Sequence, residues 1–237
     1  MQPIPLLAPA PVAFPDPRSA RDEPDGLVAA GGALTPAWLI EAYSRGIFPW
    51  FDSDDDHILW WSPSERAVLV PGQMRVTRSL AKRVRNAGFL VSLDTRFHAV
   101  IEGCAGPRRD GGGTWITAAM RTAYGELHDL GFAHSVEIWR ETRLVGGLYG
   151  IALGRMFFGE SMFSVESDAS KCAFYFLQQW LEAHAYSLID CQLMNPHLAR
   201  LGVSPMPRDT FLNALADNAR YGTRGESWRL SPRSITL

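Results

Sequence analysis

The sequence predicts a mixed α/β (α+β) fold in which a small N-terminal α/β domain precedes a larger domain. Three observations lead to this prediction. Apolar residues recur at helical spacing in several segments, three consecutive segments have strand character, and proline and aromatic residues are concentrated near the N-terminus. A length of 237 residues permits a small domain joined to a larger one, and we place the boundary between residues 1–65 and 66–237.

Composition and charge are those of an ordinary globular chain, with 46% hydrophobic and 20% charged residues, which excludes a disordered or fibrous protein. The formal charge of −2 gives no global preference for nucleic acid, so any RNA contact requires a local basic patch. No run approaches the roughly 18 apolar residues of a membrane span. Three widely spaced cysteines and the lack of a signal-like N-terminus indicate the reducing cytoplasm.

The N-terminal domain is predicted to contain a helix that begins after Thr35, its N-cap, and ends near Tyr43 before Gly46. Two later segments, Gly46–Phe51 and Trp60–Pro63, place many aromatic side chains in irregular backbone. These side chains either pack a small core or form the wall of a binding pocket or base-stacking surface.

A basic helix is predicted from Thr77, its N-cap, to Asn86, with Gly88 just past the end. Basic and apolar side chains fall on opposite faces of this helix. Such a face is either solvated or binds RNA phosphates. The patch that we consider consists of Arg75, Arg78, Lys82, Arg83 and Arg85.

The second half of the chain is predicted to contain two helices and four strands. A helix from Ala118 to Leu130 has Thr117 as its N-cap, and another helix follows Ser167–Asp168. The pattern between them predicts an antiparallel meander, and one more strand follows the second helix. The predicted strands are His134–Trp139, Leu144–Leu153, Met156–Phe163 and Ser187–Leu193.

The last of these strands carries the most informative polar residues. Alternation places Asp190 and Gln192 on one face, and a carboxylate beside an amide in an apolar stretch needs solvent, a mutual contact or a ligand. An exposed edge strand is the alternative to a site. Earlier, Gly159–Ser164 combines Glu160 and hydroxyls with apolar side chains, as in a pocket for a hydrocarbon group or at a capped strand end. The histidines and cysteines lack metal-ligand spacing, which predicts no metal.

Eight segments, in the same order, closely resemble the leucyl/phenylalanyl-tRNA–protein transferase family. The resemblance extends from about Phe14 to Phe211, and we assign no function to the proline-rich N-terminus or to the tail after Arg220. The segments are Phe48–Phe51, Trp60–Pro63, Gly113–Ile116, Ala133–Glu137, Leu144–Gly147, Gly159–Ser164, Ala169–Lys171 and Leu188–Gln192.

The resemblance implies an N-terminal domain packed on an acetyltransferase-like (GNAT-like) catalytic domain with a mixed, largely antiparallel sheet. It implies an aminoacyltransferase that needs no cofactor and takes leucine or phenylalanine, and methionine less well, from aminoacyl-tRNA. The acceptor would be the α-amine of an N-terminal arginine or lysine of a protein, which is thereby marked for degradation by the N-end rule pathway. The resemblance suggests no membrane partner.

The resemblance also implies roles for five residues. The positions that match Asp190 and Gln192 are implicated in peptide-bond formation, and those that match Trp50, Trp115 and Glu160 lie in or near the aminoacyl-adenosine pocket. We expect the Gln192 side-chain oxygen to accept a hydrogen bond from the attacking amine. Asp190 would then fix the orientation of the amide or assist proton removal.

The contacts with the tRNA backbone and with the cation of the acceptor are predicted from charge alone. The basic patch is expected to bind tRNA phosphates with little sequence preference. The cation of the acceptor needs an acidic surface, and Glu137, Glu160 and Asp54–Asp56 are all candidates.

Two other classes of protein stay open. An acyl-CoA-dependent acetyltransferase is suggested by Arg108–Gly113, which fits the R/QxxGxG/A pyrophosphate loop, although no clear strand precedes it. A noncatalytic RNA-binding module would explain the basic helix and the tryptophans but leaves Asp190 and Gln192 unexplained.

Overall fold

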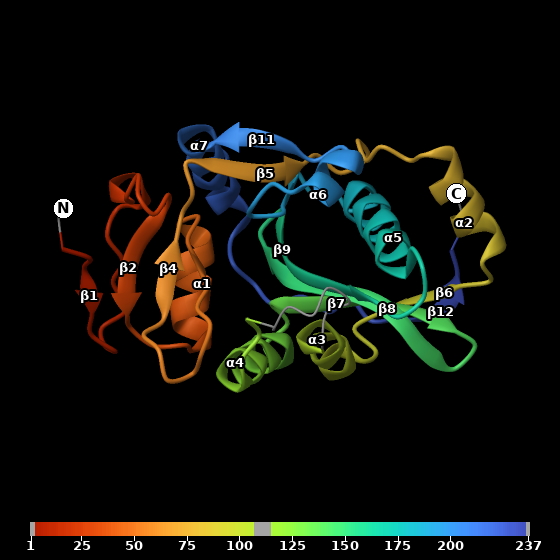
Figure 1. The fold of residues 1–237 in the computed structure, drawn as a ribbon, viewed down its shortest axis with the longest axis horizontal. Coiled ribbons are helices and arrows are strands. Elements are labelled where there is room, and N and C mark those ends of the chain that lie inside the picture. Colours follow the sequence, from red (N-terminus) through yellow and green to blue (C-terminus); the bar gives the residue numbers. More distant parts are fainter. Residues whose placement is uncertain (1–2, 107–114, 236–237) are drawn as a thin grey trace.

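The computed structural model describes residues 3–106 and 115–235, which form two β-sheets with helices packed around them (Figure 1). The glycine-rich segment Arg108–Gly113 lies outside the described residues. Within the described ranges, no helix is both long enough and apolar enough to cross a membrane.

The N-terminal part contains a four-stranded sheet in the order β1-β2-β4-β3 and one α-helix beside it. The predicted helix is confirmed as α1, Pro36–Ser44, and Gly46 takes up a positive φ of 73° just after its end. Thr35 stands at the N-cap position without a side-chain cap, and Pro36 supplies the first helical residue instead. The strands are β1 (Leu6–Leu7), β2 (Leu27–Gly31), β3 (Phe48–Pro49) and β4 (Leu59–Trp61), and a 3-10 helix spans Pro17–Ser19.

The larger sheet confirms the predicted mixed, largely antiparallel α/β fold. Its order is β11-β5-β10-β9-β8-β7-β6-β12, and β9 with β10 is the parallel pair among antiparallel neighbours. The strands are β5 (Glu65–Leu69), β6 (Leu90–Leu93), β7 (Ala133–Arg140), β8 (Arg143–Leu153), β9 (Met156–Ser164), β10 (Leu188–Asp190), β11 (Ser204–Pro207) and β12 (Leu230–Ser234).

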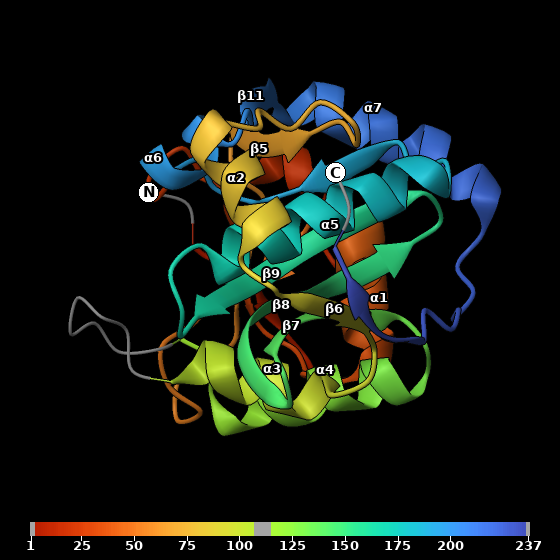
Figure 2. The ribbon, with the colours of Figure 1, turned by 90° about the vertical axis from the view of Figure 1, so that its right-hand side faces the viewer.

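The predicted meander is confirmed as β7, β8 and β9, which lie at the centre of this sheet. Helices α3 (Phe97–Ala105) and α4 (Ala118–Asp129) cover one face, and α5 (Ala169–Ala183) covers the other (Figures 1 and 2). Because both faces are covered, β7 and β8 are buried along most of their length rather than at alternate residues.

Two of the predicted helix starts have the predicted caps. Thr77 accepts a hydrogen bond from the Leu80 amide at the start of α2 (Arg78–Asn86), and Thr117 accepts one from Met120 at the start of α4. Each cap satisfies an amide that has no partner within its helix.

The predicted strand Ser187–Leu193 is confirmed in position, but its predicted length is wrong. The strand β10 covers only Leu188–Asp190, and it lies between β5 and β9, so the edge-strand alternative is excluded. Gln192 has a positive φ of 62°, which ends the alternation on which the shared face of Asp190 and Gln192 was predicted.

Several elements were not predicted from the sequence, among them α3 and the outer strands of the large sheet. The others include α6 (Pro196–Arg200), α7 (Arg208–Asn218) and a 3-10 helix over Ala219–Tyr221. The division at residue 65 stays a prediction, because one apolar cluster contains both Trp38 of the N-terminal part and Tyr149 of the large sheet.

Candidate active site

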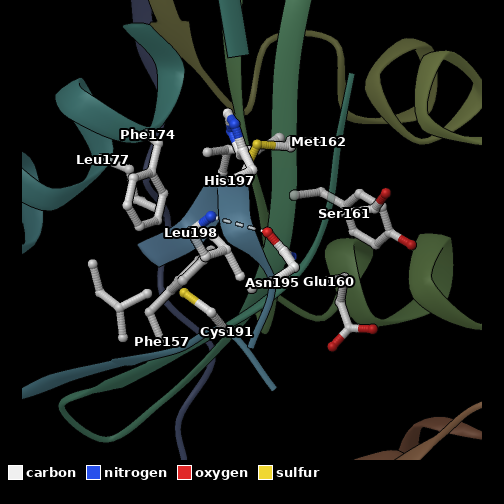
Figure 3. A pocket seen from close by; sticks show the side chains of 14 residues that line it. Phe157, Glu160, Ser161, Met162, Phe174, Leu177, Cys191, Asn195, His197 and Leu198 are labelled. Atoms are coloured by element: carbon white, nitrogen blue, oxygen red, sulfur yellow. Dashed lines mark hydrogen bonds between the residues drawn. The ribbon is translucent and has the colours of Figure 1, made fainter. Parts of the chain in front are cut away.

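An apolar pocket lies between α5 and the strands β9 and β10 (Figure 3). The two strands pair only as far as Phe158 and Asp190. Beyond that point the strands separate, and α6 approaches the opening, with its N-cap Asn195 accepting a hydrogen bond from Leu198. The cavity measures about 220 Å³.

The pocket has apolar walls and a few polar groups, as a site for a hydrocarbon side chain requires. Rings and aliphatic chains come from the sheet, α5 and α6, while the polar side chains come mainly from β9 and the segment around α6 (Figure 3). The apolar lining includes Leu148, Phe157, Met162, Phe174, Leu177, Ile189 and Leu198, and the polar lining includes Glu160, Ser161, Asn195 and His197.

Beneath this pocket, Asp190 forms a completely buried ion pair with Arg66 of β5. Both side chains are 0% exposed, and the Arg66 guanidinium donates from Nη2 at 2.5 Å and from Nε at 3.1 Å. Arg66 Nη1 also donates to the Gly46 carbonyl, and its guanidinium lies between the rings of Phe48 and Phe211. Such bidentate pairing is the strong form of the arginine–carboxylate contact.

Asp190 also fixes the backbone at Gln192. Its Oδ1 accepts a hydrogen bond of 2.8 Å from the Gln192 amide nitrogen. A left-handed backbone at a residue other than glycine costs about 1–3 kcal/mol and persists only where surrounding contacts impose it. The buried carboxylate is one such contact, so its geometry supports an orienting role for Asp190.

The second polar network is centred on Glu160. Its carboxylate accepts hydrogen bonds from Tyr43 of α1 at 2.5 Å, from Tyr124 of α4 at 3.0 Å and from Gln192 Nε2 at 2.8 Å. Burial raises the pKa of Glu160 to about 7, while the two tyrosine hydrogen bonds oppose this shift and the Asp190 charge adds to it.

Tyr43 and Tyr124 keep their hydroxyl protons and act as hydrogen-bond donors to Glu160. Burial, together with the charge of Glu160, holds the pKa values of Tyr43 and Tyr124 well above the usual range. The Gln192 side-chain amide donates to Glu160 through its nitrogen, and no described residue donates a hydrogen bond to the amide oxygen. That oxygen is therefore available to accept a hydrogen bond from a ligand.

Trp50 and Trp115 lie outside the apolar pocket. Trp50 is 41% exposed and lines an open cleft with Asp52, Asp56, His57 and Trp61. Trp115 is half-buried against the apolar cluster that contains Tyr124. The structure thus brings Asp190, Gln192 and Glu160 together, whereas no described contact joins either tryptophan to them.

The residues of the basic patch lie on and beside α2. Arg83 donates to the Ser167 carbonyl at 2.9 Å, whereas Arg75, Arg78, Lys82 and Arg85 are exposed and form no side-chain bond to a described residue.

Next to this patch, Arg75 lines a second cleft together with Lys171 and Arg200. His197 lines both this cleft and the apolar pocket. Burial, followed by the charges of Lys171 and Arg200, lowers the pKa of His197.

The structure also reduces the choice of acidic groups for the acceptor's cation. Glu137 is completely buried, and its carboxylate accepts hydrogen bonds from Ser92, Thr95 and Ser135. It therefore cannot meet a substrate in this conformation. Among the described residues, no group of three or more histidine, cysteine or acidic side chains could hold a metal ion.

Sequence reasoning did not identify Arg66, Tyr43 or Tyr124 as part of the site. Tyr124 fits the helical spacing that predicts burial, and a buried hydroxyl needs a partner, so this signal was present. Arg66 begins an apolar run, and the argument that singled out Asp190 applies equally to it.

The arrangement places an apolar pocket beside an amide that is held by Glu160, and comparisons with known proteins identify the class of the chain. The chain matches the family described as leucyl/phenylalanyl-tRNA protein transferase over residues 68–216 and the N-terminal domain of that transferase over residues 32–64. The chain therefore belongs to the leucyl/phenylalanyl-tRNA–protein transferase family and is an aminoacyltransferase.

Individual relatives agree with this assignment. A leucyl/phenylalanyl-tRNA–protein transferase from Azoarcus sp. is 57% identical over 90% of this chain and 89% of its own length. One from Chromohalobacter salexigens is 55% identical over 97% of this chain and 89% of its own length.

Solved structures show only weak likeness. The C-terminal domain of a putative lysylphosphatidylglycerol synthetase from Agrobacterium fabrum is 11% identical, with a TM-score of 0.43 over 83% of this chain and 73% of that one. A GCN5-related N-acetyltransferase from Kribbella flavida is 13% identical, with a TM-score of 0.39 over 73% and 61%. Scores at this level carry no weight in the assignment.

The buried ion pair predicts a large loss of stability in Arg66→Ala. Removing one partner leaves the Asp190 charge buried and unpaired, which costs about 3–5 kcal/mol of the free energy of unfolding, measured by urea titration. The matched control is Arg18→Ala, whose pair with Asp209 is exposed and contributes about 0–1 kcal/mol. Equal effects of the two substitutions would contradict the structural role of the buried pair.

The raised pKa of Glu160 predicts a specific pH dependence of stability. Between the ordinary value of 4.5 and the folded value of about 7, the folded chain holds the Glu160 proton more tightly than the unfolded chain does. The Glu160 contribution to the free energy of unfolding is thus fully present below 4.5 and is lost as the pH rises through 7.

This contribution is measured as the difference between wild type and Glu160→Gln in urea titrations at a series of pH values. The difference is expected to fall with rising pH. Glu166→Gln is the control. Hydrogen bonds from Arg140 lower the pKa of Glu166, so the difference between wild type and this variant is expected to rise, not fall, with increasing pH below 4.5. A difference that stays flat from pH 4.5 to 7 would rule out the raised pKa.

Proposed function

We propose that this enzyme transfers leucine or phenylalanine, and methionine less well, from aminoacyl-tRNA to the α-amine of an N-terminal arginine or lysine of a protein. The reaction takes place in the cytoplasm and marks the acceptor for degradation by the N-end rule pathway. The observation that carries this proposal is the apolar pocket with the Glu160–Gln192 pair at its edge.

The chemical demand on the protein is modest. The ester that links the amino acid to the tRNA ribose is already activated, so the enzyme mainly places an uncharged amine against the ester carbonyl. An α-amino group has a pKa of about 7.7–8.0, so a useful fraction is uncharged near neutrality. The new C–N bond replaces the ester C–O bond, and the ribose hydroxyl leaves with the proton that the amine loses.

Gln192 is the proposed catalytic residue, and Asp190 is assigned a positioning role beside it. The Gln192 oxygen would accept a hydrogen bond from the attacking amine, because Glu160 already holds the amide nitrogen. Both oxygens of Asp190 are engaged by Arg66 in a completely buried site, which argues against direct proton removal from the substrate.

The pocket accounts for the proposed breadth of amino-acid choice. Apolar walls discriminate by only about 1–3 kcal/mol per methylene, so leucine, phenylalanine and methionine would all enter. Trp50 and Trp115 are proposed to contact the adenosine end of the substrate, outside the apolar cavity.

The basic patch is proposed to bind the tRNA backbone. Arg75, Arg78, Lys82, Arg83 and Arg85 lie on and beside α2, and Arg75 shares a cleft with Lys171 and Arg200. Because His197 lines both that cleft and the apolar pocket, the two lie side by side, which supports a path for the tRNA phosphates toward the aminoacyl end.

The proposed function is tested by incubating the protein with labelled Leu-tRNA or Phe-tRNA and peptides that begin with arginine, lysine, aspartate or alanine. Transfer is expected to the arginine and lysine peptides only. Gln192→Ala is expected to lower transfer by about 10²-fold or more with aminoacyl-tRNA affinity retained.

Gln179→Ala, on the outer part of α5, is the matched control and is expected to leave transfer unchanged. Transfer to aspartate peptides would overturn the acceptor rule. Tight tRNA binding without transfer by the wild type would favour a noncatalytic RNA-binding module.

Phosphate binding by the patch predicts a steep dependence of tRNA affinity on salt. Between 50 and 200 mM salt, a titration is expected to show a strong fall in affinity, and Lys82→Ala is expected to reduce the log–log slope by about 1. Arg18→Ala, in the N-terminal part and remote from α2, is the control that leaves the slope unchanged. A flat response of the wild type would mean that the patch is a solvated helix face.

A further inference from the structure

The C-terminal segment returns from α7 to the large sheet and adds its outermost strand. Strand β12 pairs antiparallel with β6, with Leu230 opposite Leu93 and Ser234 opposite Leu90 (Figure 2). Just before this strand, Trp228 is inserted into the core and is only 3% exposed. The segment lies beyond residue 216, where the family match ends.

Trp228 occupies a cage of rings contributed by three elements and one loop. Its ring stacks on His134 of β7 at 4.0 Å and lies 4.1 Å from Trp180 of α5. Tyr186, in the loop that precedes β10, meets it edge-on, and Phe157 of β9 lies at 5.7 Å in a stacked orientation. A ring in such a cage is fixed on all sides.

The contact with Phe157 connects this cage to the apolar pocket. Phe157 is 1% exposed and lines the pocket (Figure 3), and the same ring is in contact with Trp228. The far end of the Phe157 ring rests on Gly150, where a Cβ would approach its Cζ to 2.6 Å. Phe157 therefore forms a wall of the pocket that is backed by Gly150 and Trp228.

We propose that Trp228 is a positioning residue that sets the depth of the aminoacyl pocket through Phe157. Interior side chains keep their positions because close-packed neighbours leave no room for movement. With a smaller residue at 228, the Phe157 ring gains space behind it, and the pocket deepens. A phenylalanine side chain is longer than that of leucine, so the deeper pocket favours Phe-tRNA over Leu-tRNA. This inference rests on the proposed function for its two substrates.

A purely structural role for Trp228 would have a different signature. Loss of stability or of folded protein lowers transfer from both substrates by the same factor, so the ratio of their kcat/KM values does not change. The ratio therefore isolates the effect on the pocket. Ile235 provides a matched control, because it is buried in the same C-terminal segment and the same apolar cluster but belongs neither to the cage of rings nor to the pocket lining.

The experiment measures kcat/KM for Phe-tRNA and Leu-tRNA, with one arginine peptide as acceptor, in the wild type and in variants at position 228. Trp228→Ala is expected to raise the Phe-to-Leu ratio about tenfold, the effect of roughly one methylene in an apolar pocket. Trp228→Leu leaves a smaller cavity and gives the same test if the alanine variant does not fold. Trp228→Phe is expected to restore most of the wild-type ratio, and Ile235→Ala to leave it unchanged.

The possible outcomes distinguish a failure of the inference about Trp228 from a failure of the proposed function. An unchanged ratio in folded Trp228→Ala or Trp228→Leu overturns the inference alone, since the wild type still transfers both amino acids. A change of the same size in Ile235→Ala overturns it as well, because the effect would then be general to the segment. Absence of transfer by the wild type overturns the proposed function, and the inference with it.

Discussion

The buried pair of Arg66 and Asp190 is the interaction on which the position of the site depends. Two charges removed from water carry a desolvation cost that only excellent geometry offsets. Here the guanidinium is bidentate on the carboxylate, donates to the Gly46 carbonyl and lies between the rings of Phe48 and Phe211. The pair therefore joins β5 and β10 to the turn after α1 and to α7, and it holds the backbone from which Gln192 projects.

Glu160 is the second point at which distant segments meet, and it acts on the same residue. Its carboxylate collects the hydroxyls of Tyr43 from α1 and Tyr124 from α4, while its contact with Gln192 fixes the amide. Gln192 is thus held twice, by its backbone through Asp190 and by its side chain through Glu160. Both anchors stand on regular elements, so the fold itself fixes the orientation of the Gln192 amide.

The helix caps and the meander could be predicted from the sequence because they depend on residues that are close together in the chain. Thr77 and Thr117 were predicted as caps from their position before helical patterns, and the meander followed from strand periodicity and its turns. Strand β10 was predicted too long because the positive φ of Gln192 has no local signature. The site residues were named by residue type and resemblance, whereas the pairing of Arg66 with a carboxylate 124 positions later is set by the folded sheet.

The separation of β9 and β10 has a consequence for how this cavity can change. After Asp190 the chain stays bonded to β5, through Cys191 to the Ala67 carbonyl and through the Ala67 amide to the Gln192 carbonyl, while it leaves β9. The cavity is consequently a gap in the backbone rather than a void left by small side chains. Side chains along its walls can be exchanged without closing it. Substitutions that leave the main chain unchanged can therefore adapt the cavity to apolar side chains of different size.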